Sequence, residues 1–224
     1  FGIHGMHSHL HDQQEMRKNM AVYYGMISLM DQYIGRILAH LDARGLAENT
    51  LVVFTTDHGH LFGQHGMNAK GPFHYEDLVR LPFLVRWPGR VEAGSESDAL
   101  MSLVDMTPSF LAATGTQADR GMSGIDQTPV WTGSQQSLRD HVIVENRHEP
   151  TTIHARTFVN QRYKLTVHYG RDEGELFDLQ EDPKEIQNRW SDPSCAQLKG
   201  QLIQDLLHAE LGKEPLVMPR IAGA

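Results

Sequence analysis

Residues 50–60 read TLVVFTTDHGH, and the fold is most readily inferred from this stretch. Its first part, residues 50–56, is short, continuously apolar and rich in β-branched residues, a pattern typical of a strand buried on both faces of a parallel sheet. Asp57 and His58 follow at once, where the carboxyl end of that strand would lie. Because ligands bind at this edge of open α/β sheets, the stretch predicts an architecture and the place of a site.

An amphipathic helix is expected just upstream of this strand. Apolar residues recur at i, i+3, i+4 and i+7 through about five turns, at Tyr23, Met26, Ile27, Met30, Ile34, Ile37, Leu38 and Leu41. Gly45 is a natural stop for such a helix. A helix that feeds a buried strand is typical of α/β architecture.

Further elements are expected downstream. Residues 81–87 read as a second buried strand closed by Pro88-Gly89, and residues 99–113 as a helix that Pro108 kinks or bounds. Residues 116–136 read as a surface loop before a strand at 141–145. Short strands at 157–159, 163–167 and 175–179 predict an antiparallel meander, and a capped terminal helix begins near Asp192-Pro193. We therefore predict two domains, residues 1–136 and 137–224.

The composition excludes some classes of partner. There are 28 acidic and 20 basic residues, the formal net charge is -8, and no basic block of five or more occurs, so nucleic acid is not an expected partner. The longest apolar runs are too short for a membrane span. A single cysteine, Cys195, cannot form an internal disulfide, so the sequence does not indicate a cellular compartment.

The polar residues after the first strand carry the candidate chemistry. Asp57 and His58 can both point at one divalent cation, while Lys70 supplies a positive charge and the glycines at 59, 63, 66 and 71 let the backbone turn closely. The alternative is a capping or hydrogen-bonding Asp-His pair. His65 and His74 lie close by, where they either orient Lys70, touch substrate, or serve as loop histidines that satisfy backbone groups. Near the start, the histidines at 4, 7, 9 and 11 form either a metal site or an exposed cluster.

The motifs Asp57-His58-Gly59, Gly63-Gln64-His65-Gly66, Lys70-Gly71 and Tyr75-Glu76 together resemble the sulfatase family of the alkaline phosphatase superfamily. The resemblance runs over about residues 17–210 and includes Arg162-Tyr163-Lys164-Leu165 and Glu181-Asp182-Pro183. It implies the C-terminal part of an alkaline-phosphatase-like α/β sheet sandwiched by helices, followed by a small antiparallel subdomain with a terminal helix.

The resemblance also implies an activity, the hydrolysis of small-molecule or sugar sulfate esters. Asp57 and His58 would be ligands of the active-site cation, usually calcium in sulfatases and sometimes manganese in relatives, and Lys70 would hold a sulfate oxygen. A hard cation and a lysine placed in advance stabilise the charge that develops as the S–O bond breaks.

Parts of the family's site do not occur in this sequence. The formylglycine nucleophile arises from Cys or Ser in C/S-x-P-x-R, and an Asp-Asp pair supplies further cation ligands; neither is found, and Cys195 lies outside such a motif. His4 and His7 are candidates for the acid that protonates the leaving alcohol. Since the chain starts at Phe1 without a methionine or a signal peptide, we expect a truncation, with a missing N-terminal half as the partner and no activity for these residues alone.

Two other functions remain open. One is a phosphonate or phosphate ester hydrolase of the same superfamily, and the other is a noncatalytic binding module derived from it. The organic part of the substrate would depend on variable loops such as residues 116–136 and 148–154. The sequence does not indicate an oligomeric state.

Overall fold

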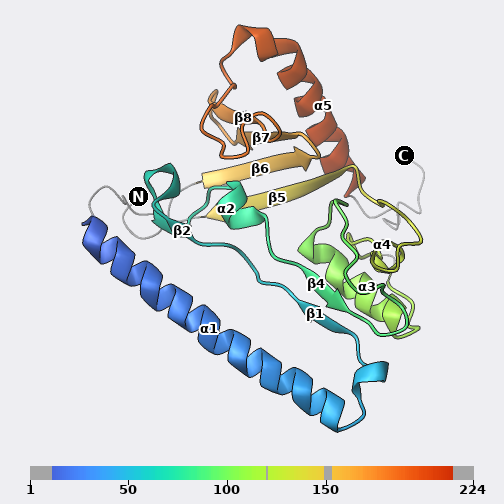
Figure 1. The fold of residues 1–224 in the computed structure, drawn as a ribbon. Helices are drawn as coiled ribbons and strands as arrows, with labels where there is room; N and C mark the ends of the chain where they lie inside the picture. The colour runs from blue at the N-terminus through green and yellow to red at the C-terminus, as the bar shows by residue number, and fades with distance from the viewer. Residues whose placement is uncertain (1–11, 120, 149–152, 214–224) are drawn as a thin grey trace, which may run out of the picture. The chain divides into compact units, whose positions relative to one another are not determined.

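The computed structural model describes residues 12–119, 121–148 and 153–213 (Figure 1). The chain divides into two compact units, residues 1–95 and 96–224. The first unit carries the residues singled out as the candidate site. The domain boundary predicted between residues 136 and 137 lies inside the second of these units, and it stays a prediction.

Helix α1, Gln13–Ala43, opens the described part of the first unit. It begins ten residues before the expected apolar stripe because Asp12 caps it, accepting a hydrogen bond from the backbone N–H of Gln14 at 3.0 Å. It ends where expected, with Gly45 at a φ of 65°. None of its residues is buried, and apolar members of the stripe such as Met26 and Ile37 are 56% and 62% exposed. The amphipathic pattern is therefore confirmed as a helix, but much of its apolar face is exposed among the described residues.

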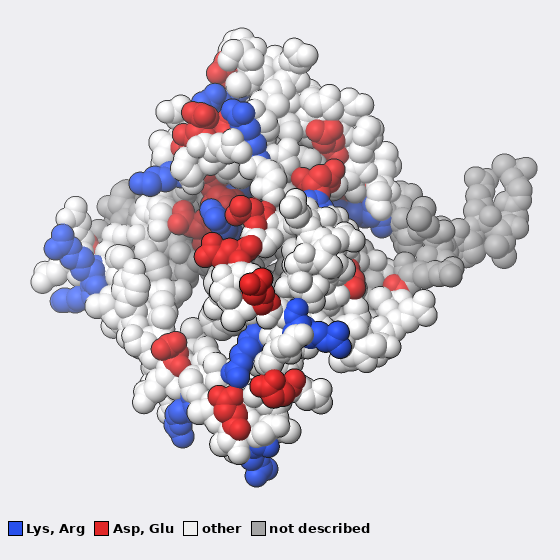
Figure 2. Space-filling view, turned by 45° about the vertical axis from the view of Figure 1, so that its right-hand side comes forward, with Lys and Arg blue, Asp and Glu red and all other residues white. Residues whose placement is uncertain are grey.

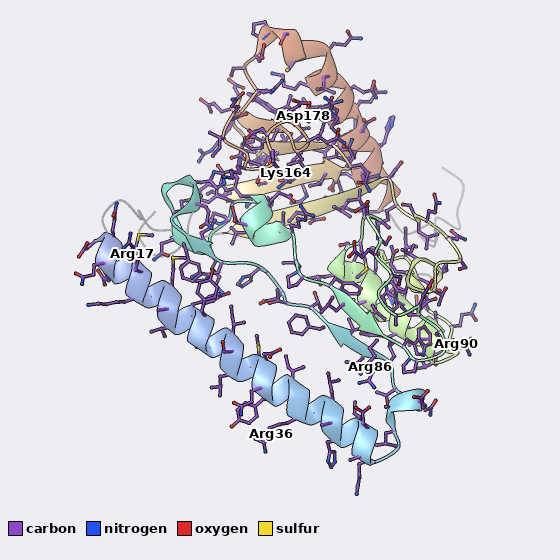
Figure 3. The ribbon with its side chains drawn as sticks, viewed as in Figure 1. Arg17, Arg36, Arg86, Arg90, Lys164 and Asp178 are labelled. Carbon is purple, nitrogen blue, oxygen red and sulfur yellow. The ribbon has the colours of Figure 1, made fainter. Side chains whose placement is uncertain are left out.

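Strand β1, Val52–Phe54, pairs with β4, Leu84–Arg86, in antiparallel register with Val53 opposite Val85. Every strand pairing among the described residues is antiparallel, and β1 is only partly buried. We expected this strand to be buried on both faces of a parallel sheet. Among the described residues, β1 is instead only partly buried and pairs with an antiparallel strand. A continuous apolar run predicts a strand without specifying the direction of its partner. At the far end of α1, Asp42 accepts a 2.8 Å hydrogen bond from Arg86, which is labelled in Figure 3.

The second unit begins with a helical region around a buried carboxylate. The 3-10 helix η4, Leu103–Asp105, leads into α3, Met106–Ala113, so the expected helix at 99–113 starts four residues late, where Ser102 and Asp105 form a capping box. Pro108 lies in the first turn of α3, where proline is tolerated. Asp105 is fully buried and accepts hydrogen bonds from Arg139, Gln127 and the backbone N–H groups of Ser102 and Ile125. The short helix α4, Thr128–Trp131, follows.

The rest of the second unit is the expected meander with its terminal helix. The strands pair in the order β5-β6-β7-β8, with bounds His141–His148, Ile153–Asn160, Tyr163–His168 and Gly174–Asp178. The 3-10 helix η6, Pro193–Cys195, follows the sheet and leads into α5, Ala196–Gly212, and Asp192 caps η6 at the predicted start of the terminal helical segment. The core of this unit lies between sheet and helix, and consists of Phe158, Leu165, Leu176, Cys195, Leu202 and Leu206.

One ion pair is buried in this meander. Lys164 and Glu185 are 1% and 3% exposed, and Lys164 Nζ lies 2.8 Å from Glu185 Oε1. Lys164 is labelled in Figure 3. Burial removes both charges from water, so each depends on the other for its stabilisation.

The charges on the surface are mixed, as the composition suggests. Positive and negative side chains are interspersed among the described residues on the face drawn in Figure 2. Within the described ranges, no helix combines the length and apolar character that crossing a membrane requires.

Candidate functional site

A short hairpin carries Lys70 back towards His58. Strand β2, Leu61–Phe62, pairs with β3, Asn68–Ala69, with Leu61 opposite Ala69. Gly63 at a φ of 104° starts the connecting turn. In an antiparallel pair, the residue number rises along one strand as it falls along the other. Continued by one position beyond Leu61 and Ala69, the register would set Lys70 across from His60. The hairpin thus returns the chain to the residues that follow β1.

His58 and Lys70 meet at the open end of this hairpin. Lys70 Nζ lies 3.1 Å from His58 Nε2, and His58 Nδ1 lies 2.8 Å from the carbonyl oxygen of Gly59. A carbonyl only accepts and an ammonium only donates, so Nδ1 carries the proton and Nε2 presents a lone pair. A backbone carbonyl that fixes the other ring nitrogen is the usual support of a metal-binding histidine.

Asp57 brings a second electron-pair donor to the same place. Its Oδ2 lies 3.4 Å from His58 Nε2, and its side chain is 80% exposed. A hydrogen bond from the Thr56 hydroxyl, at 3.2 Å, and the backbone N–H of His58 hold the pKa of Asp57 below its ordinary value. The Lys70 ammonium group, 3.1 Å from the same Nε2, supplies the positive charge beside this pair. A carboxylate and an imidazole side by side are donor types that fit a divalent cation.

The close approach of another segment explains why residue 59, next to His58, is a glycine. Gly59 donates a 2.9 Å hydrogen bond to the carbonyl oxygen of Leu78 in helix α2, Glu76–Val79. A Cβ at position 59 would lie 1.8 Å from the carbonyl oxygen of Asp77. Only glycine allows this contact, so the backbone next to His58 is held directly against α2.

The other histidines of this stretch fall into different surroundings. The His65 ring stacks on Tyr75 with centroids 3.7 Å apart and an interplanar angle of 7°, and its Nε2 lies 3.9 Å from Asp77 Oδ2. His74 is buried. The contacts of His65 with Tyr75 and Asp77 join the hairpin turn to the start of α2, which favours the role of a loop histidine over the orientation of Lys70.

Three rings that were not predicted as site residues lie beside the site. Tyr23 of α1 stacks on His60 with centroids 5.7 Å apart and meets Phe62 edge-on at 4.7 Å, while His60 and Phe62 are 4.6 Å apart. Burial lowers the pKa of His60 below its ordinary value. The aromatic character of residues 60 and 62 was visible in the sequence, but their contact with Tyr23 was not.

The structure describes only one of the remaining candidates. His4, His7, His9 and His11 lie outside the described residues. Cys195 is buried in the core of the second unit. Within the described part of the chain, no group of three or more His, Cys, Asp and Glu side chains could hold a metal ion.

Comparison with known proteins gives the family. Residues 3–116, which contain Asp57, His58 and Lys70, match the family described as Sulfatase, and residues 63–211 match N-sulphoglucosamine sulphohydrolase, C-terminal. The chain belongs to the sulfatase family. This sulfatase chain also has the expected fold, since solved structures of the alkaline phosphatase superfamily superpose on most of it.

Individual relatives agree with this assignment. An N-acetylglucosamine-6-O-sulfatase of Bacteroides thetaiotaomicron is 31% identical over 199 residues, which cover 86% of the chain and 35% of the relative. A protein solved in complex with its substrate, D-glucosamine-2-N,6-O-disulfate, is 29% identical with a TM-score of 0.79, covering 84% of the chain and 40% of its own. The phosphonate monoester hydrolase of Agrobacterium radiobacter is 26% identical with a TM-score of 0.82, covering 92% and 44%. The sulfatase chain thus spans well under half the length of these relatives.

Proposed function

We propose that this chain is part of a sulfatase that hydrolyses sulfate monoesters of sugars with the help of a divalent cation. The observation that carries the proposal is the convergence of Asp57, His58 and Lys70 at the open end of the β2–β3 hairpin, with Lys70 Nζ 3.1 Å from His58 Nε2. The sugar class is supported by the relatives, one named for N-acetylglucosamine 6-O-sulfate chemistry and one solved with a sulfated glucosamine.

Asp57 and His58 would hold the cation. Calcium is the first candidate, and manganese is the alternative because an imidazole is a softer ligand than calcium usually takes. When bound, the cation would stabilise negative charge on the sulfate oxygens. Thr56 and the Gly59 carbonyl prepare the two ligands for this role, the first by favouring an ionised carboxylate and the second by fixing the imidazole tautomer.

Lys70 would bind a sulfate oxygen. Its ammonium group is a compact charge on a flexible stem and can reach a substrate anion from the hairpin edge without moving the backbone. The sulfate group gains negative charge on its oxygens as the S–O bond breaks, so a lysine in this position stabilises the transition state more than the ground state.

The rest of the site would come from the remainder of a longer protein. The formylglycine nucleophile and the other cation ligands would lie in an N-terminal half, without which residues 1–224 would be inactive. This part of the proposal is supported by coverage, since the chain matches only 35% of the sulfatase relative and 40% of the substrate complex.

The test uses the complete protein that contains this chain. It is assayed for sulfate release from N-acetylglucosamine 6-sulfate and from glucosamine carrying N- and 6-O-sulfate, with and without a chelator. Lys70→Ala is expected to lower kcat/KM by about 10²- to 10³-fold, the usual effect of removing one group that stabilises the transition state. Lys18→Ala, an exposed lysine on α1, is the matched control. Sulfate release that is unaffected by both the chelator and Lys70→Ala would reject the proposed site.

A phosphonate monoester hydrolase is the second candidate, favoured by the similarity to the Agrobacterium radiobacter enzyme. Assaying the same preparation on a phenyl phosphonate monoester and a phenyl sulfate gives the ratio of the two kcat/KM values. A ratio in favour of the phosphonate would replace the sulfatase proposal. No hydrolysis of any ester, with a cation bound, would favour a noncatalytic binding module.

A further inference from the structure

The ring cluster of Tyr23, His60 and Phe62 joins the long helix α1 to the hairpin that carries Lys70. Tyr23 is in the third turn of α1, whereas His60 and Phe62 flank Leu61 on and beside strand β2. The three centroid distances lie between 4.6 and 5.7 Å, within the range of favourable aromatic contacts. All three rings are partly buried, so the cluster lies at the surface of the unit and not in a core.

His60 connects this cluster to the candidate site through the backbone. It is two residues from His58 along the chain, and it lies one position beyond the Leu61–Ala69 pair, at the end of the hairpin where Lys70 follows Ala69. A rotation of the backbone at His60 would therefore change the position of His58 and the alignment of Lys70 together. The hairpin itself is weak, with only two paired positions, so it depends on side-chain contacts for its orientation.

We propose that Tyr23 is a positioning residue, which acts through its stack on His60 to hold the start of the hairpin and thereby keeps Lys70 aligned with the Asp57-His58 pair. The expected effect on catalysis rests on the proposed function. The stack of Tyr23 on His60 is observed independently of that function. Tyr23 is not a catalytic residue, since its ring meets His60 and Phe62 and not the groups that would touch sulfate.

The size of the effect follows from the stacking energy. A contact can shift an equilibrium only by the difference in its free energy between the aligned and misaligned states. Aromatic pairs of this kind change an equilibrium constant by about 2- to 12-fold. Loss of the Tyr23 ring is therefore expected to weaken cation binding, and to lower kcat, by a factor in that range, with a smaller change in KM.

The experiment compares four variants of the complete protein: Tyr23→Leu, Tyr23→Phe, His60→Leu and the double variant Tyr23→Leu/His60→Leu. The readouts are the calcium Kd from titration calorimetry, kcat and KM on a sugar sulfate, and amide hydrogen exchange of residues 57–70. Tyr24→Leu is the matched control, because Tyr24 is the next residue on α1 and its ring is 60% exposed.

The expected result has three parts. Tyr23→Leu raises the calcium Kd and lowers kcat within the stated range and speeds amide exchange in residues 57–70. Tyr23→Phe restores all three, because the ring and not the hydroxyl makes the contact. The double variant is no worse than the more severe single variant, since both remove the same interaction.

Other results would overturn the proposal. If Tyr23→Leu matches Tyr24→Leu in all three readouts, or if the effects of the Tyr23 and His60 variants simply add, Tyr23 does not position the site. If the wild-type protein neither binds calcium nor releases sulfate, the proposed function fails, while hydrogen exchange still decides whether Tyr23 holds the hairpin.

Discussion

Replacing Gly59 by alanine tests whether the close contact with α2 places the cation ligands. The new Cβ would lie 1.8 Å from the Asp77 carbonyl oxygen and 2.8 Å from the Asp77 carbonyl carbon. Both neighbours belong to the backbone, so neither can rotate away. Since Cβ atoms do not approach other atoms within 3.0 Å, the two segments must separate by roughly 1 Å or more.

A separation of that size has two measurable consequences. The hydrogen bond from Gly59 N to Leu78 O would lengthen from 2.9 Å to well beyond hydrogen-bonding range. An unpaired backbone donor destabilises the fold by about 1–3 kcal/mol when it is shielded from water. The same shift moves the adjacent His58, and a displacement of about 1 Å in a catalytic group lowers activity by about 100-fold.

The assay measures urea unfolding and kcat/KM of the complete protein for Gly59→Ala beside Gly200→Ala. Gly200 lies in α5, and a Cβ added there would have nothing within 4 Å, so alanine should stabilise the helix by about 1 kcal/mol and leave activity unchanged. The reasoning would be refuted if Gly59→Ala kept wild-type stability and activity within twofold.

Three further outcomes are expected. Calcium should raise the Tm of the complete protein, and Asp57→Asn should abolish most of that rise in a thermal scan, because it removes the ionised ligand; an equal rise in the variant would show that the cation binds elsewhere. Lys164→Met should destabilise the protein by about 3–5 kcal/mol in urea unfolding, and adding Glu185→Leu should recover part of this loss, since the single change leaves a buried charge unpaired. Although burial raises the pKa of Asp105, hydrogen bonds from Arg139 and backbone N–H groups hold it below the ordinary 3.8. The stabilisation by Asp105 is therefore complete above about pH 4 and lost as the pH falls through the lower folded-state pKa; Asp105→Asn should flatten this acid-dependent decline in unfolding measured from pH 2 to 6.

The meander and the terminal helix could be predicted closely from the sequence. Alternating strands at 157–159, 163–167 and 175–179 and a capped helix after Asp192 are local patterns, and the observed strands and helix overlap each of them. The order of pairing also follows from the short connections, because neighbouring strands joined by tight turns pair with each other.

The surroundings of the candidate site were less predictable. Strands β2 and β3 have two residues each, too few for a period to appear, so the hairpin that returns Lys70 to His58 was not anticipated. The contact of Tyr23 with His60 joins residues far apart in the sequence, and no local pattern encodes it. The chemical identity of Asp57, His58 and Lys70 was visible in the motif, but the tautomer of His58 follows only from the observed contact with Gly59.

The core between the meander and α5 affects how the protein folds during synthesis. Its strands and α5 are consecutive in the chain, and their contacts span short stretches of sequence, a topology that favours rapid folding. Ribosomes release the chain from its N-terminus, so residues 57–70 emerge before this core has been synthesised. The last part of this chain needs no earlier strand to pair its own sheet, so its core can form as soon as these residues have left the ribosome.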